Sequence, residues 1–130
     1  MTATTPSDSR HFVVDSSGWL EYLAEGTKAD QFGIYLESPE NVLLPSIVAY
    51  EVYKKLFRGS GKELAEIFLS HFQDRLVDLN LELSVLAART GLEAQLPMAD
   101  VIIYATAHHH RAKLVTSDPH FDNLPDVILI

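Results

Sequence analysis

The sequence predicts an α/β fold, a three-layer α/β/α sandwich around a mostly parallel sheet. Short apolar runs alternate with longer segments of helical periodicity along most of the 130 residues. Strands that alternate with helices are typically joined by right-handed crossovers, which make the strands parallel and cover both faces of the sheet. Hydrophobic residues make up 47% of the chain, which is enough for a compact core.

We expect a single domain over residues 11–130, preceded by a flexible tail at 1–10 that is rich in Thr and Ser. The tail has no apolar stretch of the kind found in a secretory signal. The chain also contains no run of about 18 apolar residues, which is the length that would predict a membrane helix. The chain has no cysteine, which excludes disulfides and thiolate zinc sites. Together these features favour the cytoplasm.

The first half of the chain is predicted to hold two strands and three helices. They are a strand at 11–14, helices at 17–24 and 29–36, a strand at 42–44 and a helix at 46–58. Ser38 and Pro39 end the second helix, because the residue before proline disfavours helical geometry. Ser46 is the expected N-cap of the third helix, which stops at Gly59.

The second half is predicted to hold three further helices and three further strands. They are a helix at 62–72, a strand at 76–78, helices at 82–94 and 97–109, and strands at 114–116 and 127–129. The buried face of the first of these helices is expected to carry Leu64, Ile67, Phe68 and Phe72. Pro97 suits the first turn of its helix, where no backbone N–H is needed.

Two acidic residues follow predicted strands. Asp15 comes directly after the strand at 11–14, and Asp118 follows the strand at 114–116 after one residue. Ligands of open parallel sheets bind at the carboxyl ends of the strands, so these two carboxylates are expected at one edge. Each also has a simpler interpretation, because Asp15 could cap the next helix and Asp118, before Pro119, could form a turn.

Two more acids fall on predicted helices. Asp100 lies in the first turn of the helix at 97–109, where the helix dipole stabilises a carboxylate. Glu51 interrupts an apolar run at 47–53, where an unpaired charge is costly to bury. If the four acids converge, each ionised pair about 5 Å apart costs roughly 3 kcal/mol at an effective dielectric of about 20. A hard divalent ion such as Mg²⁺, with Mn²⁺ as the alternative, would offset that repulsion and bind substrate phosphate.

The net charge of −8 does not favour binding to nucleic acid, but its distribution is uneven. Four of the ten basic residues, Lys54, Lys55, Arg58 and Lys62, lie within nine positions. They could contact a phosphate backbone or simply form a solvated helix face. The charge alone therefore leaves both interpretations open.

Four segments, in order, resemble the motifs of the PIN domain family, particularly the VapC-like toxins of type II toxin–antitoxin pairs. The resemblance covers almost the whole chain from Phe12 onward. The segments are VDSSGWLE at 14–21, SIVAYEV at 46–52, LPMADVIIYATA at 96–107 and LVTSDPHF at 114–121.

The resemblance implies a PIN-like nuclease domain and roles for particular residues. It implies that the metal-binding acids are Asp15, Glu51, Asp100 and Asp118, with Thr116 and Ser16 assisting through their hydroxyls. It also implies cleavage of RNA with Mg²⁺ or Mn²⁺, a homodimer, and inhibition by a cognate antitoxin. In such an enzyme the candidates for contacts to the RNA backbone are Lys54, Lys55 and Arg58.

Other functions fit the same residues less well. A receiver-like signalling domain would use Asp78 as its phosphoacceptor, but Ser16 stands where a second acid would be expected beside Asp15, and no lysine ends the last strand. A catalytically idle PIN-like binding protein would not need all four acids. Gly59-Ser60-Gly61-Lys62 lacks the spacing of a phosphate loop. Consecutive histidines at 108–110 point in different directions on a helix and make a poor metal site.

Overall fold

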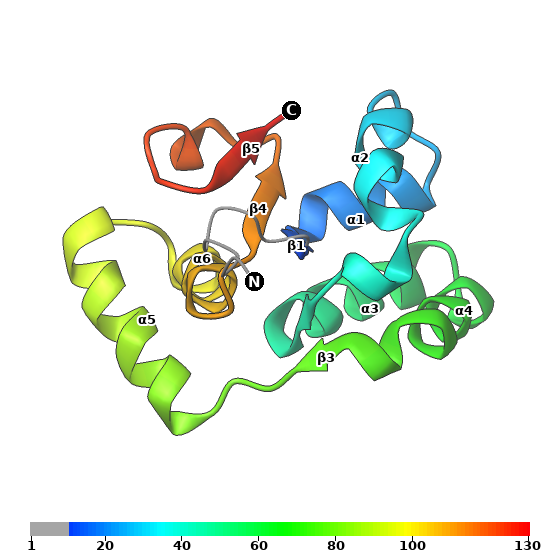
Figure 1. The fold of residues 1–130 in the computed structure, drawn as a ribbon. Helices are drawn as coiled ribbons and strands as arrows, with labels where there is room; N and C mark the ends of the chain where they lie inside the picture. Colours follow the sequence, from blue (N-terminus) through cyan, green and yellow to red (C-terminus); the bar gives the residue numbers. More distant parts are fainter. Residues whose placement is uncertain (1–10) are drawn as a thin grey trace, which may run out of the picture.

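The computed structural model describes residues 11–130, so the tail predicted at 1–10 lies outside the described residues. Within that range the structure has five short strands, and every pairing between them is parallel. They are β1 (Phe12–Val14), β2 (Leu44–Pro45), β3 (Leu76–Val77), β4 (Lys113–Thr116) and β5 (Val127–Leu129). Each strand is only two to four residues long, and the helices surround the sheet (Figure 1).

Two pieces of sheet meet at β1. One piece has the order β1–β4–β5 and the other consists of β2 and β3. A bridge between Phe12 and Val42, with a hydrogen bond from the Leu43 N–H to the Phe12 carbonyl at 2.9 Å, joins them. The order across the molecule is therefore β3–β2–β1–β4–β5. The chain leaves β1 toward one edge and later returns through β4 toward the other, which places a topological switch point at the carboxyl ends of β1 and β4.

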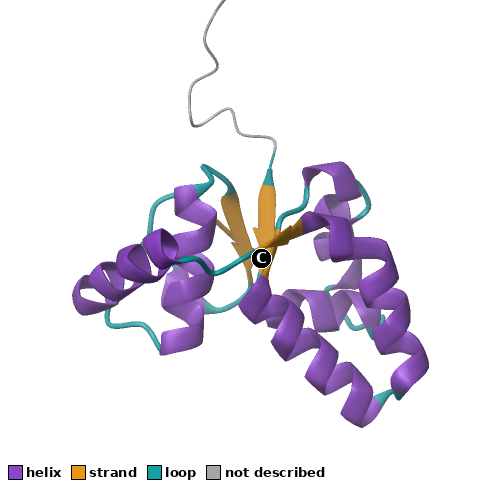
Figure 2. Ribbon diagram, turned by 90° about the horizontal axis from the view of Figure 1, so that it is seen from below, coloured by secondary structure: helices purple, strands orange, loops and turns teal. Residues whose placement is uncertain are grey.

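Helices cover both faces of the sheet, which confirms the predicted α/β sandwich (Figure 2). The helices are α1 (Ser16–Leu23), α2 (Ala29–Leu36), α3 (Ser46–Gly59), α4 (Lys62–Phe72), α5 (Leu81–Ala94) and α6 (Met98–His109). On one face α6 contacts β1 and β4, with α5 packed outside it, and on the other α1 contacts β4 and α2 contacts β1. In turn, α3 packs against α1 and α4. No helix in the described range is long and apolar enough to cross a membrane.

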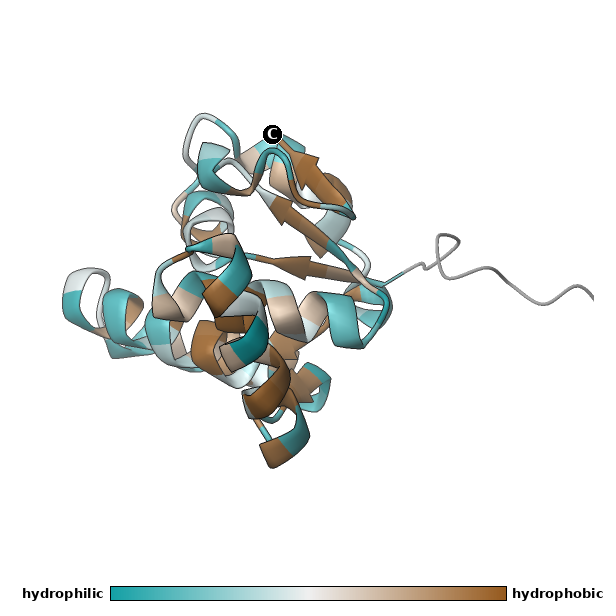
Figure 3. Cartoon of the chain, turned by 90° about the vertical axis from the view of Figure 1, so that its left-hand side faces the viewer, coloured by the Kyte–Doolittle hydropathy of each residue, from teal (hydrophilic) through white to brown (hydrophobic). Residues whose placement is uncertain are grey.

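The core forms where the apolar strands meet these helices. Val13, Val14 and Val115 are fully buried, and the strands are hydrophobic along their length in Figure 3. The fully buried Trp19 of α1 packs edge-on against Phe72 of α4, with ring centroids 4.5 Å apart. Burial of such large side chains anchors α1 and α4 to the same core.

Three local predictions were wrong. Ser46 is the first residue of α3 and not its N-cap: Pro45 takes the cap position, and the Ser46 hydroxyl donates to the Val77 carbonyl of β3 at 3.1 Å. Ile67 is 45% exposed, because the buried face of α4 is centred on Ala65 and the two phenylalanines. Pro97 precedes α6 as its cap residue and does not lie in its first turn.

Candidate functional site

Asp15 lies at the switch point and also begins α1. Its backbone N–H donates to the Val115 carbonyl at 3.2 Å, which continues the pairing of β1 with β4. Its carboxylate accepts hydrogen bonds from the Thr116 hydroxyl at 2.6 Å, the Gly18 N–H at 2.9 Å and the Ser17 hydroxyl at 3.2 Å. The side chain is buried, and the bond from Gly18 caps the helix. Both interpretations of Asp15 therefore hold at once: it is a helix cap and a strand-end acid.

The Thr116 hydroxyl connects the ends of β1 and β4. It donates to Asp15 and accepts from the Asp118 N–H at 3.0 Å. Asp118 also forms the turn that its sequence predicted, because its carboxylate accepts from the His120 N–H at 2.9 Å. The His120 ring nitrogen Nδ1 lies 3.0 Å from the same carboxylate oxygen. Asp118 is thus held by one strand residue and by the turn that follows it.

Glu51 is held across the boundary between two helices. The Ser16 hydroxyl at the start of α1 donates to its carboxylate from α3. Val48 and Val52, which precede and follow Glu51 in α3, are fully buried, whereas Glu51 is half-buried. Glu51 therefore lies at the border of the helix face that packs into the core. The two hydroxyls that the resemblance singled out, Thr116 and Ser16, each bind a carboxylate of the predicted set.

Asp100 lies in the first turn of α6, as predicted. Burial raises the pKa of its carboxyl, and the negative charges of Asp118, Asp15 and Glu51 raise it further, while His120 opposes the shift. The pKa of Asp15 is also raised by burial, against the hydrogen bonds that its carboxylate accepts. Four acids that are distant in sequence therefore share one electrostatic environment.

The donor chemistry of this cluster suits a hard divalent cation, because every candidate ligand is a carboxylate or hydroxyl oxygen. The carboxylate side chains lie farther apart than the ligands around a bound metal ion do. No three acidic or histidine side chains among residues 11–130 lie close enough together to hold a metal ion as they stand. Binding would thus require the carboxylates to turn inward, which a cation favours because it offsets their mutual repulsion.

Two side chains of the site were not predicted from the sequence. Ser17 donates to Asp15, and His120 contacts Asp118. Ser17 lies inside the motif at 14–21, where the helix cap predicted for Asp15, which the Gly18 N–H completes, was a usable signal. The contact of His120 with Asp118 depends on the turn after β4, which the pattern of apolar residues does not specify.

The cationic residues predicted to contact RNA lie on α3 beside Glu51. Lys54, Lys55 and Arg58 follow it by three, four and seven positions, so they share its side of the helix. All three side chains are exposed. The Lys54 ammonium donates to the Tyr50 hydroxyl at 3.3 Å.

Comparisons with known proteins identify the family of this fold. The profile of the PIN domain matches residues 12–127. Among solved structures, a toxin–antitoxin complex from Klebsiella pneumoniae has a TM-score of 0.77 at 21% identity, covering 89% of this chain and 94% of that one. VapBC2 from Rickettsia felis, bound to a DNA fragment from its promoter, has a TM-score of 0.68 at 23% identity, covering 92% and 96%.

VapC20 from Mycobacterium tuberculosis, a toxin that cleaves the sarcin–ricin loop, has a TM-score of 0.71 at 18% identity, covering 89% of this chain and 96% of that one. At these identities the structures establish a common fold. No curated protein sequence matches. The profile, by contrast, spans every element from β1 to the start of β5, including the strand ends and helices that carry the four acids. The chain therefore belongs to the PIN domain family.

Proposed function

We propose that this chain is a metal-dependent endoribonuclease and the toxin of a toxin–antitoxin pair. The observation that carries the proposal is the shared environment of four acids, in which burial first, and then the negative charges of Asp118, Asp15 and Glu51, raise the pKa of Asp100. A fold that only needed packing would not concentrate negative charge at one edge. Membership in the PIN family and the similarity to toxin structures support the same function.

The residues that would hold the metal are Asp15, Glu51, Asp100 and Asp118. A bound Mg²⁺ or Mn²⁺ would lower the pKa of a coordinated water, so that a carboxylate could take its proton, and would stabilise negative charge on the scissile phosphate. Oxygen ligands suit both ions, so the choice between them is left to experiment.

The remaining chemistry falls to the protein. Thr116 orients the Asp15 carboxylate from β4, and Ser16 orients Glu51 from α1. Glu51 or Asp100 accepts the proton of the attacking water as general base. Fixed positions of these groups reduce the reorganisation needed when charge develops on the phosphate.

RNA is the proposed substrate, in line with the sarcin–ricin loop as the target of VapC20. Lys54, Lys55 and Arg58 are the proposed contacts to its backbone, where each would neutralise a phosphate. A cognate antitoxin is the proposed protein partner, because the similar structures include toxin–antitoxin complexes from K. pneumoniae and R. felis.

A homodimer is part of the proposal, with the exposed apolar surface of α5 and the start of α6 as its contact surface. Leu81 and Leu92 of α5 are 81% and 86% exposed. They lie beside a groove of about 480 Å³ whose lining includes the small residues Ala88 and Gly91 and the first residue of α6, Met98, which is 75% exposed. This surface carries both projecting side chains and a groove that can accept them. Two copies related by a two-fold axis would bury both features in one self-complementary interface.

Cleavage of mixed RNA by the purified protein tests the proposal, with Mg²⁺, with Mn²⁺ and with chelator, beside the Asp100→Asn variant. We expect metal-dependent cleavage that falls at least about a hundredfold in the variant, since a catalytic proton acceptor or metal ligand is removed. The exposed acid Asp30, in the first turn of α2, provides the matched control, and Asp30→Asn should cut normally. Cleavage that survives both chelator and Asp100→Asn would contradict the proposal, and a folded protein that binds RNA without cutting it would favour the idle binding protein.

A further inference from the structure

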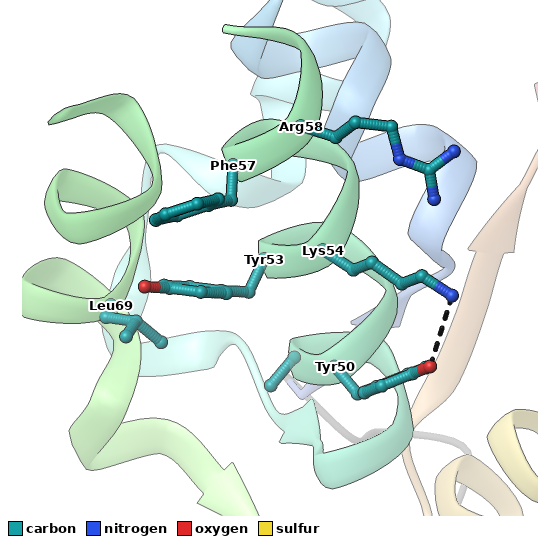
Figure 4. Close-up of a pocket in the computed structure, with 7 residues that line it drawn as sticks. Tyr50, Tyr53, Lys54, Phe57, Arg58 and Leu69 are labelled. Atoms are coloured by element: carbon teal, nitrogen blue, oxygen red, sulfur yellow. Dashed lines mark hydrogen bonds between the residues drawn. The ribbon is translucent and has the colours of Figure 1, made fainter. Parts of the chain in front are cut away.

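A groove of about 690 Å³ lies along the outer side of α3 and reaches α4 (Figure 4). Its lining residues are Ala49, Tyr50, Tyr53, Lys54, Phe57 and Arg58 of α3 and Leu69 of α4. In Figure 4, Tyr53 and Phe57 point toward Leu69, whereas Tyr50, Lys54 and Arg58 extend away from it. The volume lies within the range of sites that bind small organic ligands.

The aromatic rings of this groove are exposed and held in place. Tyr50 is 58% exposed and Phe57 is 50% exposed, so neither ring is buried in the core. The Phe57 ring stacks on Tyr53 with centroids 5.8 Å apart and planes 25° from parallel. The Tyr53 hydroxyl donates to Glu66 at 2.7 Å, and the Tyr50 hydroxyl accepts from Lys54. These contacts fix two flat apolar surfaces at the solvent boundary, which reduces the entropy lost when another ring stacks on them.

The charge of the groove is opposite to that of the molecule. Two cations and no acid line it, in a chain whose net charge is −8. Residues three, four or seven apart share a side of a helix, so Lys54 neighbours Tyr50 and Phe57 on one side and Glu51 on the other. The cations therefore lie between the aromatic rings and Glu51 of the acid cluster on the surface of α3.

We propose that this groove binds an unpaired nucleotide of the RNA beside the bond that is cut, an inference that rests on the proposed nuclease function. A base stacks on Tyr50 or Phe57, and its phosphates contact Lys54 and Arg58. Stacking requires a base face that a duplex hides, so the groove selects single-stranded RNA. An acidic amphipathic peptide has matching charge, but the continuity with Glu51 favours RNA, because the backbone must continue into the acid cluster.

Fluorescence anisotropy tests the inference in the Asp100→Asn protein with Mg²⁺, where the RNA is expected to stay intact. The probes are a labelled unstructured RNA of about ten nucleotides and an RNA duplex of the same sequence. Replacing both rings, by Tyr50→Leu with Phe57→Leu, should weaken binding of the single strand by about fivefold or more, since aromatic stacking contributes at least that much per base. Binding of the duplex should not change.

Two further variants separate stacking from other effects. Tyr50→Phe, with Phe57 intact, keeps the ring but removes the hydroxyl that binds Lys54, and should therefore weaken binding of the single strand much less than the double variant does. Lys54→Gln should weaken binding of both RNAs and lower the salt dependence of the dissociation constant, because it removes a phosphate contact. Ile67→Ala, on the exposed side of α4 and outside the groove lining, should leave both affinities unchanged. Thermal melts of each variant verify that the fold is kept.

Unchanged affinity of the double variant for single-stranded RNA would overturn the inference. If the double variant at the same time lost binding of a synthetic acidic amphipathic peptide that the parent binds, the groove would be assigned to a protein partner. Cleavage by the protein with Asp100 intact distinguishes failure of the groove proposal from failure of the proposed nuclease function. Retained metal-dependent cleavage with unchanged variant affinities rejects the groove alone, whereas absence of both cleavage and RNA binding rejects the nuclease as well.

Discussion

Asp15 illustrates how one side chain can serve both the fold and the site. Its carboxylate caps α1 through the Gly18 N–H and receives the Thr116 hydroxyl from β4. Because these hydrogen bonds favour the charged form while burial opposes it, the net rise in its pKa reflects a carboxylate that is costly to keep ionised. A bound cation would reduce that cost, so the stability of the protein should respond to the charge of the site.

Asp100 gives the most direct test of this response. Its raised pKa means that the folded protein binds the proton more tightly than the unfolded chain, whose pKa is near 3.8. The destabilisation builds up as the pH rises from that value to the folded pKa, and it is complete at neutral pH. We expect Asp100→Asn to raise the free energy of unfolding without metal at pH 7, because the neutral amide removes the repulsion that disfavours the ionised carboxylate. Urea denaturation between pH 3 and pH 7 measures this gain.

The pH dependence of the stabilisation, together with a matched variant, shows whether repulsion within the acid cluster is its cause. The gain in Asp100→Asn should vanish well below the unfolded pKa of 3.8, near about pH 3, where both the folded and the unfolded chain are protonated. Asp30→Asn removes a first-turn acid outside the cluster and should not stabilise the protein. A gain that is independent of pH, or a loss of stability at pH 7, would argue against repulsion within the cluster.

At the scale of elements, close packing of α1 onto the sheet and α2 positions Asp15. A methyl group on Gly18 would lie 2.6 Å from Val14 of β1 and 2.6 Å from Phe32 of α2. Gly18→Ala should therefore cost at least about 2 kcal/mol of unfolding free energy, because both neighbours are fully buried and cannot move freely. Gly59→Ala, at the end of α3 with open space around it, should be nearly neutral. Equal urea midpoints for the two variants would contradict this packing.

Most elements could be predicted from the sequence because their periodicity is strong. The predicted bounds of α2, α4 and β5 coincide with those observed. The exposure of Ile67 could not be predicted from α4 alone, since the buried face of a helix is chosen by its neighbours, here α3 and the Trp19 ring. The Ser46 hydroxyl found a carbonyl of β3, a partner that local sequence does not reveal.

At the scale of the whole molecule, the proximity of Asp15 and Asp118 was predictable, and the fine placement of the acids was not. The strand-end rule brings Asp15 and Asp118 to one edge, and the resemblance added Glu51 and Asp100. The hydrogen bonds of Ser17 and His120 and the looseness of the cluster depend on three-dimensional contacts. The assignment of these acids to a metal, and the cytoplasmic location, stay predictions.

The proposed dimer has a test at the same scale. Analytical ultracentrifugation should give twice the chain mass of 14.5 kDa at micromolar concentrations. Leu92→Glu, which places a charge on the exposed apolar side of α5, should give the monomer. The matched variant Ile34→Glu, at an isoleucine of α2 that is 72% exposed, should remain a dimer. A monomeric unmodified protein, or a Leu92→Glu variant that still dimerises, would reject this surface.

The central claim is that four acids from distant segments form one metal site, and titration of Mn²⁺ tests it most directly. Paramagnetic resonance of free Mn²⁺, or calorimetry, measures saturable binding to the unmodified protein, to Asp100→Asn and to Asp30→Asn. We predict binding by the unmodified protein and by Asp30→Asn, and a dissociation constant at least about tenfold higher for Asp100→Asn, since a carboxylate ligand is lost. Equal binding by all three proteins, or no saturable binding by any of them, would contradict the claim.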